Sequence, residues 1–369
     1  MQSRVHAFSA RTSIKRFSTN PQQIQLHPLQ AKASVAIVGS GAVGGYYGAR
    51  LWECGAYDVK FHMRGENFSK SKINGLKVES IHGDIFINPD ELQAFEDTKD
   101  IGQVDWVIVA LKSSALDAVP ALIRPLLKPA KTRVLAIMNG LIEEDLIRML
   151  KEYMGEDDND EHLHCCKSLY GGMAFICSNR LGPGHINHSY VGKLSVGVAA
   201  HAPTTTADES LSAFTDFWRP VKKVEMATEA SILSGRWRKC LWNLPFNGIS
   251  VAMGGITVDK IVTNPELRKL ADLVMDETIA IANADLKEHG LDESFYLVDE
   301  EKIAMFTATD KMGPYRTSTM IDLVQRNPME VQHIFQKPVE KANGLGIPVP
   351  HLETLVAQIR AFQSFYKLF

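Results

Sequence analysis

The chain has 369 residues, 45% of them apolar; it is longer than one ordinary domain of roughly 100–200 residues and so predicts two domains. Its 40 basic and 43 acidic residues leave a net charge of −3, so no global positive field attracts nucleic acid or an anionic membrane. Any anion must therefore be bound locally.

The cysteines also limit the class of protein. They are five in number and form no C-x-x-C pair, a pattern typical of a reducing compartment rather than of a disulfide scaffold. No run of 18 or more apolar residues occurs, so we expect no transmembrane helix. We expect a small-molecule substrate as the partner, and neither nucleic acid nor membrane.

Residues 1–32 differ in composition from the rest of the chain. They contain several arginines and serines but no acidic residue, and the first acid of the chain is Glu53. Such a leader is typical of an organellar transit peptide, and Arg16-Phe17-Ser18 resembles a mitochondrial processing site. We predict a mitochondrial matrix protein; a plastid address, or a cytoplasmic protein with an unstructured start, is the alternative.

A glycine-rich turn follows the short apolar run at residues 35–38 and precedes a helical pattern. This order of strand, G-x-G-x-x-G and helix is the dinucleotide-binding fingerprint. The first glycine makes the tight turn, the second lets the backbone approach a pyrophosphate, and the third lets helix pack on strand. The predicted cofactor-binding residues of the turn are Gly39, Ser40, Gly41, Ala42, Val43 and Gly44.

The predicted second strand, residues 57–63, ends directly before Arg64. Arg64 lies 20 residues after Gly44, where a carboxylate would bind the ribose hydroxyls of NAD. A guanidinium at this position instead suits the 2′-phosphate of NADPH, because its planar fork matches phosphate geometry. We therefore predict NADPH/NADP, with NAD bound by Glu66 as the alternative.

The first strand, the helix and the second strand form a predicted βαβ unit, and further apolar runs follow it. Residues 76–88 predict a hairpin insertion, and residues 104–111 and 133–138 predict buried parallel strands separated by a helical pattern at 116–127. Lys112 and Asn139 follow these two strands. Because the carboxyl ends of parallel strands open onto the cofactor crevice, we predict that both side chains contact cofactor or substrate. A solvated lysine and a simple Asn-Gly turn are the alternatives.

The chain becomes mostly helical from about residue 228. The acidic run at 156–161 predicts a surface loop and no metal site, and strands are expected at 168–178 and 192–199, on either side of Gly182-Pro183-Gly184. Helical patterns then continue to residue 369, with breaks at 313–314 and 344–350. We predict an α/β fold, with a Rossmann-type doubly wound domain at 33–225 and an all-helical domain at 226–369.

One helical segment carries polar residues at helical spacing. Lys239, Asn243 and Asn247 fall on one stripe of an otherwise apolar stretch, and Pro245 predicts a kink between them. Buried polar groups need partners, which a substrate carboxylate and carbonyl would supply. An interdomain hydrogen-bond stripe is the structural alternative.

The order of these motifs resembles the ketopantoate reductase (2-dehydropantoate 2-reductase) family. The resemblance covers about residues 33–369 and rests on GSGAVGG, Leu111-Lys112, Asn139-Gly140, the Lys239/Asn243/Asn247 stripe, Ser318 in TSTMIDL and Glu330 in PMEVQ. It implies NADPH-dependent reduction of a branched 2-oxo acid, ketopantoate, for pantothenate synthesis.

The resemblance also implies roles for single residues. Lys239 would be the general acid, and Glu330 would steady it and meet the cofactor or substrate. Asn243, Asn247 and Ser318 would bind substrate, and Asn139 would lie beside the nicotinamide. The sequence departs from the family at residues 329–332, which read MEVQ where Thr-Glu-Ile-Asp is frequent, and this leaves the identity of the 2-oxo acid open. Another branched 2-oxo acid, or a non-catalytic NADPH sensor, is the alternative, and the sequence does not fix whether the protein is a homodimer.

Overall fold

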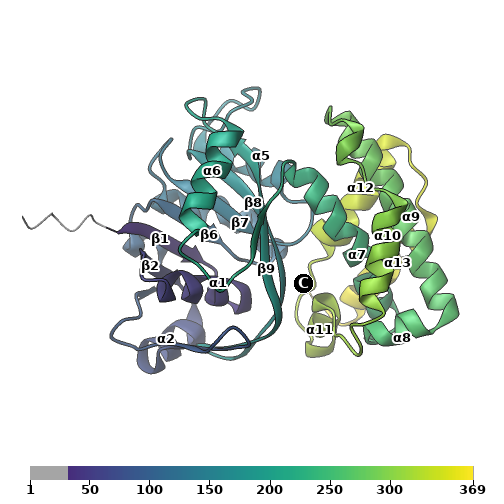
Figure 1. The fold of residues 1–369 in the computed structure, drawn as a ribbon, viewed down its shortest axis with the longest axis horizontal. Helices are drawn as coiled ribbons and strands as arrows, with labels where there is room; N and C mark the ends of the chain where they lie inside the picture. The colour runs from purple at the N-terminus through teal and green to yellow at the C-terminus, as the bar shows by residue number, and fades with distance from the viewer. Residues whose placement is uncertain (1–31, 369) are drawn as a thin grey trace, which may run out of the picture. The chain divides into compact units, whose positions relative to one another are not determined.

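One mixed sheet organises the first half of the structure, a computed structural model that describes residues 32–368. The strand order is β4-β3-β9-β8-β7-β6-β1-β2-β5, with β10 against β9 (Figure 1). The predicted transit peptide and its processing site lie outside the described residues. The strands are β1 (Ala33–Val38), β2 (Tyr57–His62), β3 (Leu76–Ser80), β4 (Ile85–Ile87), β5 (Ala94–Phe95), β6 (Trp106–Val109), β7 (Arg133–Ile137), β8 (Ser168–Gly182), β9 (His185–His201) and β10 (Met226–Thr228).

The parallel part of the sheet is covered on both faces. β1 pairs in parallel with β2 and β6, and the ladder continues in parallel through β7 to β8. Val35 and Ile37 of β1 pack into one apolar core with α1 (Ala42–Glu53) and α6 (Ala207–Trp218). Ala36 and Val38 pack into a second core with α4 (Val119–Ile123) and α5 (Glu143–Met154). This confirms the predicted doubly wound N-terminal domain.

The far side of the sheet is antiparallel. The predicted hairpin at 76–88 is confirmed, since β3 pairs antiparallel with β4. The strands expected around Gly182-Pro183-Gly184 are longer than predicted, and together they form one antiparallel hairpin, β8–β9. Its pairing shifts register between Phe175 and Ile176, opposite Val191 and Gly192, both of which have positive φ. Bulges of this kind re-aim side chains, and sequence periodicity does not reveal them.

The helical pattern predicted at 116–127 is not one helix. It consists of a 3-10 helix η1 (Ser113–Ala118), the short helix α4, and a second 3-10 helix η2 (Arg124–Leu126). Pro120 and Pro125 stand at the starts of the second and third pieces. Because proline has no N–H and clashes with the preceding turn, it is accepted at a helix start but not in its interior.

From Ile232 onward the described chain is helical, as predicted, and its core surrounds α7 (Ile232–Ala252) (Figure 1). α7 packs against α9 (Pro265–Glu288) and α13 (Pro350–Phe365), and the helical run continues through Pro245. The other helices of the structure are α2 (Gly65–Asn74), α3 (Thr98–Ile101), α8 (Val258–Thr263), η3 (Glu293–Phe295), α10 (Asp299–Thr309), α11 (Ser318–Gln325), the π-helical η4 (Gln332–Gln336) and α12 (Lys337–Leu345).

The two halves belong to one compact unit, residues 33–369. The domain boundary near residue 225 stays a prediction; in the structure β10 still pairs with β9, and the helical part begins at Ile232. The predicted helix breaks near 313 and 344–350 are confirmed by the ends of α10 and α12. Within the described residues, no helix has the length and apolarity needed to cross a bilayer.

Candidate active site

The three fingerprint glycines have different surroundings. Gly39 has a φ of +94°, and a Cβ on it would lie 2.6 Å from the side chain of Leu111. A Cβ on Gly44 would lie 2.2 Å from the carbonyl oxygen of Gly39. A Cβ on Gly41 would meet no described atom within 4 Å. Gly39 and Gly44 are therefore required by the turn and by its packing, whereas Gly41 leaves open space beside the backbone. This is the arrangement that a dinucleotide pyrophosphate needs.

The first turn of α1 follows Gly41 directly. The helix begins at Ala42 and Val43, and within the described residues no side chain caps its N-terminus. Ser40 does not serve as a cap, because its hydroxyl donates to the carbonyl oxygen of His62 at 3.0 Å and the residue is buried. The uncapped N–H groups and the positive end of the helix dipole suit an anion, so these residues fit a dinucleotide phosphate.

Arg64 lies where a 2′-phosphate would be expected. It directly precedes α2 and lines a hollow of about 390 Å³. Glu66, the alternative ribose ligand, lines the same hollow. The sequence did not predict the other wall, which comes from the β8–β9 hairpin tip. The hollow is lined by Arg64, Glu66, Asn67, Arg180, Leu181, Gly182 and Pro183.

A chain of hydrogen bonds joins the predicted general acid to the buried glutamate. Lys239 Nζ donates to Asn139 Oδ1 at 2.9 Å, and Asn139 Nδ2 donates to Glu330 Oε2 at 3.1 Å. Since lysine can only donate and a carboxylate can only accept, the orientation of the Asn139 amide follows from its partners. The other oxygen of Glu330 accepts from the backbone N–H of Ser113 at 2.7 Å and from its hydroxyl at 3.1 Å. The structure thus brings Asn139, Lys239 and Glu330 together, and adds Ser113.

The surroundings of Lys239 favour its deprotonation. Burial and the nearby guanidinium of Arg236 lower the pKa of Lys239 to about 8, against the opposing effect of Glu330. Its ammonium also donates to the carbonyl oxygen of Ala174 at 3.0 Å and lies 5.4 Å from the ring centre of Phe175. A lysine with this pKa is mostly protonated at neutral pH but releases its proton far more easily than an exposed lysine. Such a group suits general acid catalysis.

Arg236 is held rigidly one helical turn before Lys239. Its guanidinium donates to Glu143 Oε1 at 2.9 and 2.6 Å and to the carbonyl oxygen of Met138 at 2.6 Å, and its side chain is only 1% exposed. The carbonyl of Met138 directly precedes Asn139. These contacts hold the positive charge of Arg236 near Lys239 and also hold the end of β7 in place.

The two asparagines of the stripe are linked to α11. Asn247 Nδ2 donates to Asn243 Oδ1 at 3.2 Å, and Asn247 Oδ1 accepts from the backbone N–H of Thr319 at 3.2 Å. Asn247 is buried, whereas Ser318, the first residue of α11, is exposed. Asn247 therefore holds the start of α11, and the side chains of Asn243 and Ser318 keep hydrogen-bonding capacity for a ligand.

Lys112 bridges the two halves. Its ammonium donates to Asp322 Oδ1 of α11 at 2.7 Å and to the carbonyl oxygen of Pro328 at 3.2 Å. Burial raises the pKa of Asp322, and the ammonium of Lys112 opposes that effect. The sequence predicted a cofactor contact for Lys112. The structure shows an ion pair and leaves the lysine side chain 44% exposed, so the cofactor contact stays a prediction.

Comparison with known proteins assigns the chain to a family. The family described as "Ketopantoate reductase PanE/ApbA" matches residues 35–201, and its C-terminal counterpart matches residues 231–363. A relative from Nostoc sp., named 2-dehydropantoate 2-reductase, is 33% identical over 88% of this chain and 93% of its own length. The chain belongs to the ketopantoate reductase family.

Solved structures agree with this assignment. The 2-dehydropantoate 2-reductase of Geobacter metallireducens is 33% identical, with a TM-score of 0.76 over 89% of this chain and 99% of that one. A D-mandelate dehydrogenase solved with NADH and anilino(oxo)acetate has a TM-score of 0.75 over 91% of this chain and 100% of its own, but at 19% identity it shows the shared fold alone. Ketopantoate reductases are NAD(P)-dependent oxidoreductases that act on a small molecule.

Sequence reasoning missed several residues of this candidate site. Ser113 and Arg236 each lie within three positions of a predicted residue, Lys112 or Lys239. Ser113 could have been found by examining the residues next to the strand ends, and Arg236 by examining the helical turn before Lys239. Phe175 and Arg180 carried no such signal, because the bulge and the hairpin length that place them are tertiary features.

Proposed function

We propose that this chain reduces 2-dehydropantoate (ketopantoate) to pantoate with NADPH, for pantothenate and coenzyme A synthesis, and that Lys239 is the general acid. The observation that carries the proposal is the ammonium of Lys239, with its pKa lowered to about 8 and its position held by Asn139, just after β7, and by Ala174 of β8. The glycine turn and Arg64 fit the cofactor.

The reaction needs a proton at the carbonyl oxygen as a hydride reaches the carbonyl carbon. The hydride comes from NADPH when it is bound. Lys239 polarises the ketone through its ammonium, donates the proton to the oxygen and stabilises the developing alkoxide. Glu330 and Asn139 orient Lys239, and Glu330 keeps a negative charge near the ammonium. Asn243, Ser318 and the remaining N–H of the Asn247 amide hold the substrate hydroxyl and carboxylate.

A reductase for a different branched 2-oxo acid is the second candidate. The ring of Phe175 is 39% exposed and lies beside Lys239, so it presents an apolar face to any ketone that accepts a proton there. Asn247, one of the polar residues that would meet a hydroxyl, is already engaged with Asn243 and Thr319. Both features favour a substrate with an apolar side chain.

Steady-state oxidation of NADPH and NADH with ketopantoate, pyruvate and 2-oxoisovalerate separates these candidates. The first proposal requires that ketopantoate with NADPH gives the highest kcat/KM. A higher kcat/KM for another acid would support the second candidate. A protein that binds NADPH yet reduces none of the acids would instead be a sensor.

The cofactor assignment has its own test. Arg64→Ala should weaken NADPH binding far more than NADH binding, because only NADPH carries the 2′-phosphate that the guanidinium would hold. Equal weakening of both cofactors would contradict the role assigned to Arg64.

A further inference from the structure

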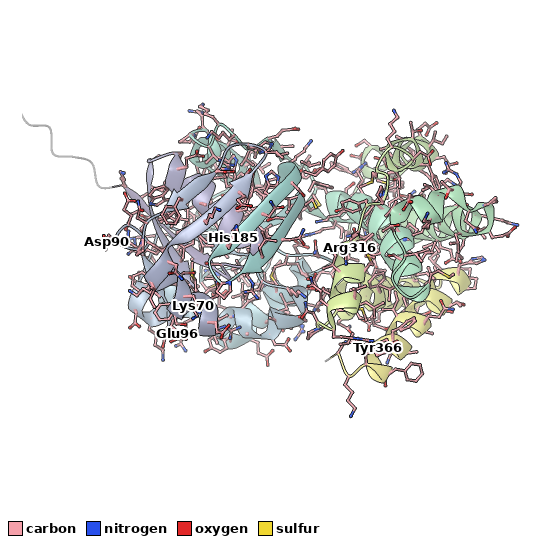
Figure 2. The ribbon with its side chains drawn as sticks, turned by 90° about the horizontal axis from the view of Figure 1, so that it is seen from below. Lys70, Asp90, Glu96, His185, Arg316 and Tyr366 are labelled. Atoms are coloured by element: carbon pink, nitrogen blue, oxygen red, sulfur yellow. The ribbon has the colours of Figure 1, made fainter. Side chains whose placement is uncertain are left out.

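The tip of the β8–β9 hairpin is fastened to the dinucleotide turn. Asn67 of α2 makes the connection: its Oδ1 accepts from the backbone N–H of Gly184 at 2.9 Å, and its Nδ2 donates to the carbonyl oxygen of Ser40 at 3.1 Å. The backbone N–H of Lys77 donates to the carbonyl oxygen of Gly184 at 2.8 Å and holds the tip from its other side. Figure 2 shows His185, the first residue of β9, on the same half of the molecule as Lys70 of α2.

This docking brings a second guanidinium to the hollow of Arg64. Arg64 and Arg180 line the same space of about 390 Å³, and both side chains are exposed. Among the described residues, neither guanidinium has a hydrogen bond or ion pair with protein. Glu66, the acid of this lining, pairs with neither arginine.

Two guanidinium groups that line one hollow make it a favourable place for an anion. The arginine side chain is always charged, so both groups keep their positive charge at every ordinary pH. A phosphate monoester offers several acceptor oxygens and up to two negative charges, and so it can accept hydrogen bonds from two arginine forks at once. A ribose hydroxyl offers neither the charge nor the number of acceptors.

We propose that Arg180, supplied by the β8–β9 hairpin, binds the 2′-phosphate of NADPH together with Arg64, and that the hairpin is therefore part of the cofactor-specificity site. The inference rests on the proposed use of NADPH. It goes further in assigning half of the phosphate clamp to Arg180, which lies 116 residues after Arg64 in the sequence and whose hairpin tip is held in place by Asn67.

Cofactor binding measured by calorimetry tests this inference without any turnover. The ligands are NADPH, NADH, 2′,5′-ADP and 5′-AMP, and the variants are Arg180→Gln, Arg180→Lys and Arg64→Gln. Loss of one charge-assisted contact predicts that Arg180→Gln weakens NADPH and 2′,5′-ADP by roughly tenfold or more while NADH and 5′-AMP stay within about twofold. Arg180→Lys should lie between Gln and the wild type, since it keeps the charge but loses the fork.

The matched control is Arg360→Gln, an exposed arginine on α13 in the helical half, which should change none of the four affinities. Since the guanidinium of Arg180 has no partner among the described residues, the Tm of the variant should equal that of the wild type. If Arg64→Gln weakens NADPH and Arg180→Gln does not, the role of Arg180 is refuted while the use of NADPH stands. Equal weakening of NADPH and NADH by Arg180→Gln also overturns the inference. A wild type that does not prefer NADPH over NADH refutes the proposed cofactor itself.

Discussion

Replacing Glu330 by glutamine tests whether the buried carboxylate sets the charge state of the general acid. Glu330 raises the pKa of Lys239, against the lowering effects of burial and of Arg236. Glutamine keeps the size of the side chain and one acceptor oxygen but removes the negative charge. The charged form of Lys239 then loses a favourable interaction, so its pKa should fall below about 8.

The size of the effect follows from the hydrogen-bond path. Contacts of 2.9 and 3.1 Å on the two sides of the Asn139 amide place the two charges about 7 Å apart when ordinary bond lengths are added. At an effective dielectric constant of roughly 20–40, two unit charges at this separation interact by about 1–2.5 kcal/mol, which corresponds to about one to two pKa units. The Lys239 pKa in the variant should therefore lie between about 6 and 7.

The measurement is the pH dependence of kcat/KM. A general acid must be protonated, so the wild-type rate should fall as pH rises through about 8. In Glu330→Gln this basic limb should move to lower pH by one to two units, roughly as calculated above. Glu300→Gln, an exposed glutamate at the start of α10, is the control and should leave the limb in place. An unchanged limb in Glu330→Gln, or one that moves to higher pH, would refute the coupling through Asn139.

Three further predictions concern Lys239, the glycine turn and the ring of Phe175. Lys239→Met should lower kcat by roughly 100- to 10,000-fold while NADPH affinity stays near the wild-type value; Lys287→Met on α9 is the control, and a kcat within tenfold would exclude Lys239 as the acid. Gly41→Ala should leave the Tm unchanged but abolish dinucleotide binding, whereas Gly44→Ala, whose Cβ would lie 2.2 Å from a carbonyl oxygen, should destabilise the fold by roughly 1–3 kcal/mol. Equal Tm losses would contradict this division of roles. If the ring of Phe175 packs on the substrate as proposed, Phe175→Ala should raise KM by roughly 5- to 30-fold and change kcat little, since the ring transfers no proton; a loss confined to kcat would contradict this.

The sequence predicts the parts of this site that lie at fixed positions of regular elements. The glycine spacing, the arginine at the end of β2 and the strand ends at Lys112 and Asn139 all follow from periodicity and from the geometry of parallel sheets. The stripe of Lys239, Asn243 and Asn247 follows from the helical repeat in the same way. These are local or near-local signals, so one chain without relatives is enough to find them.

The partners of these side chains do not follow from the sequence. Lys112 is placed correctly at a strand end, yet its ion pair with Asp322 depends on how α11 packs against the sheet. The Arg180 position depends on a hairpin longer than the apolar runs indicated, with a bulge opposite Val191. The helical pattern predicted at 116–127 did not take account of Pro120 and Pro125. Because proline is accepted at the start of a helix and not in its interior, these two residues indicate the breaks from local sequence alone.

The contacts that build the candidate site are also the contacts that join the two halves of the molecule. Lys239 reaches Asn139 at the end of β7, Glu330 reaches Ser113 after β6, and Lys112 reaches Asp322 of α11. Each bond therefore both orients a functional group and fixes one half against the other. A substitution here lowers activity by either route, and kcat alone does not separate them. Only a quantity tied to the proton on Lys239, such as the position of the basic limb, distinguishes a change in the acid from a change in packing.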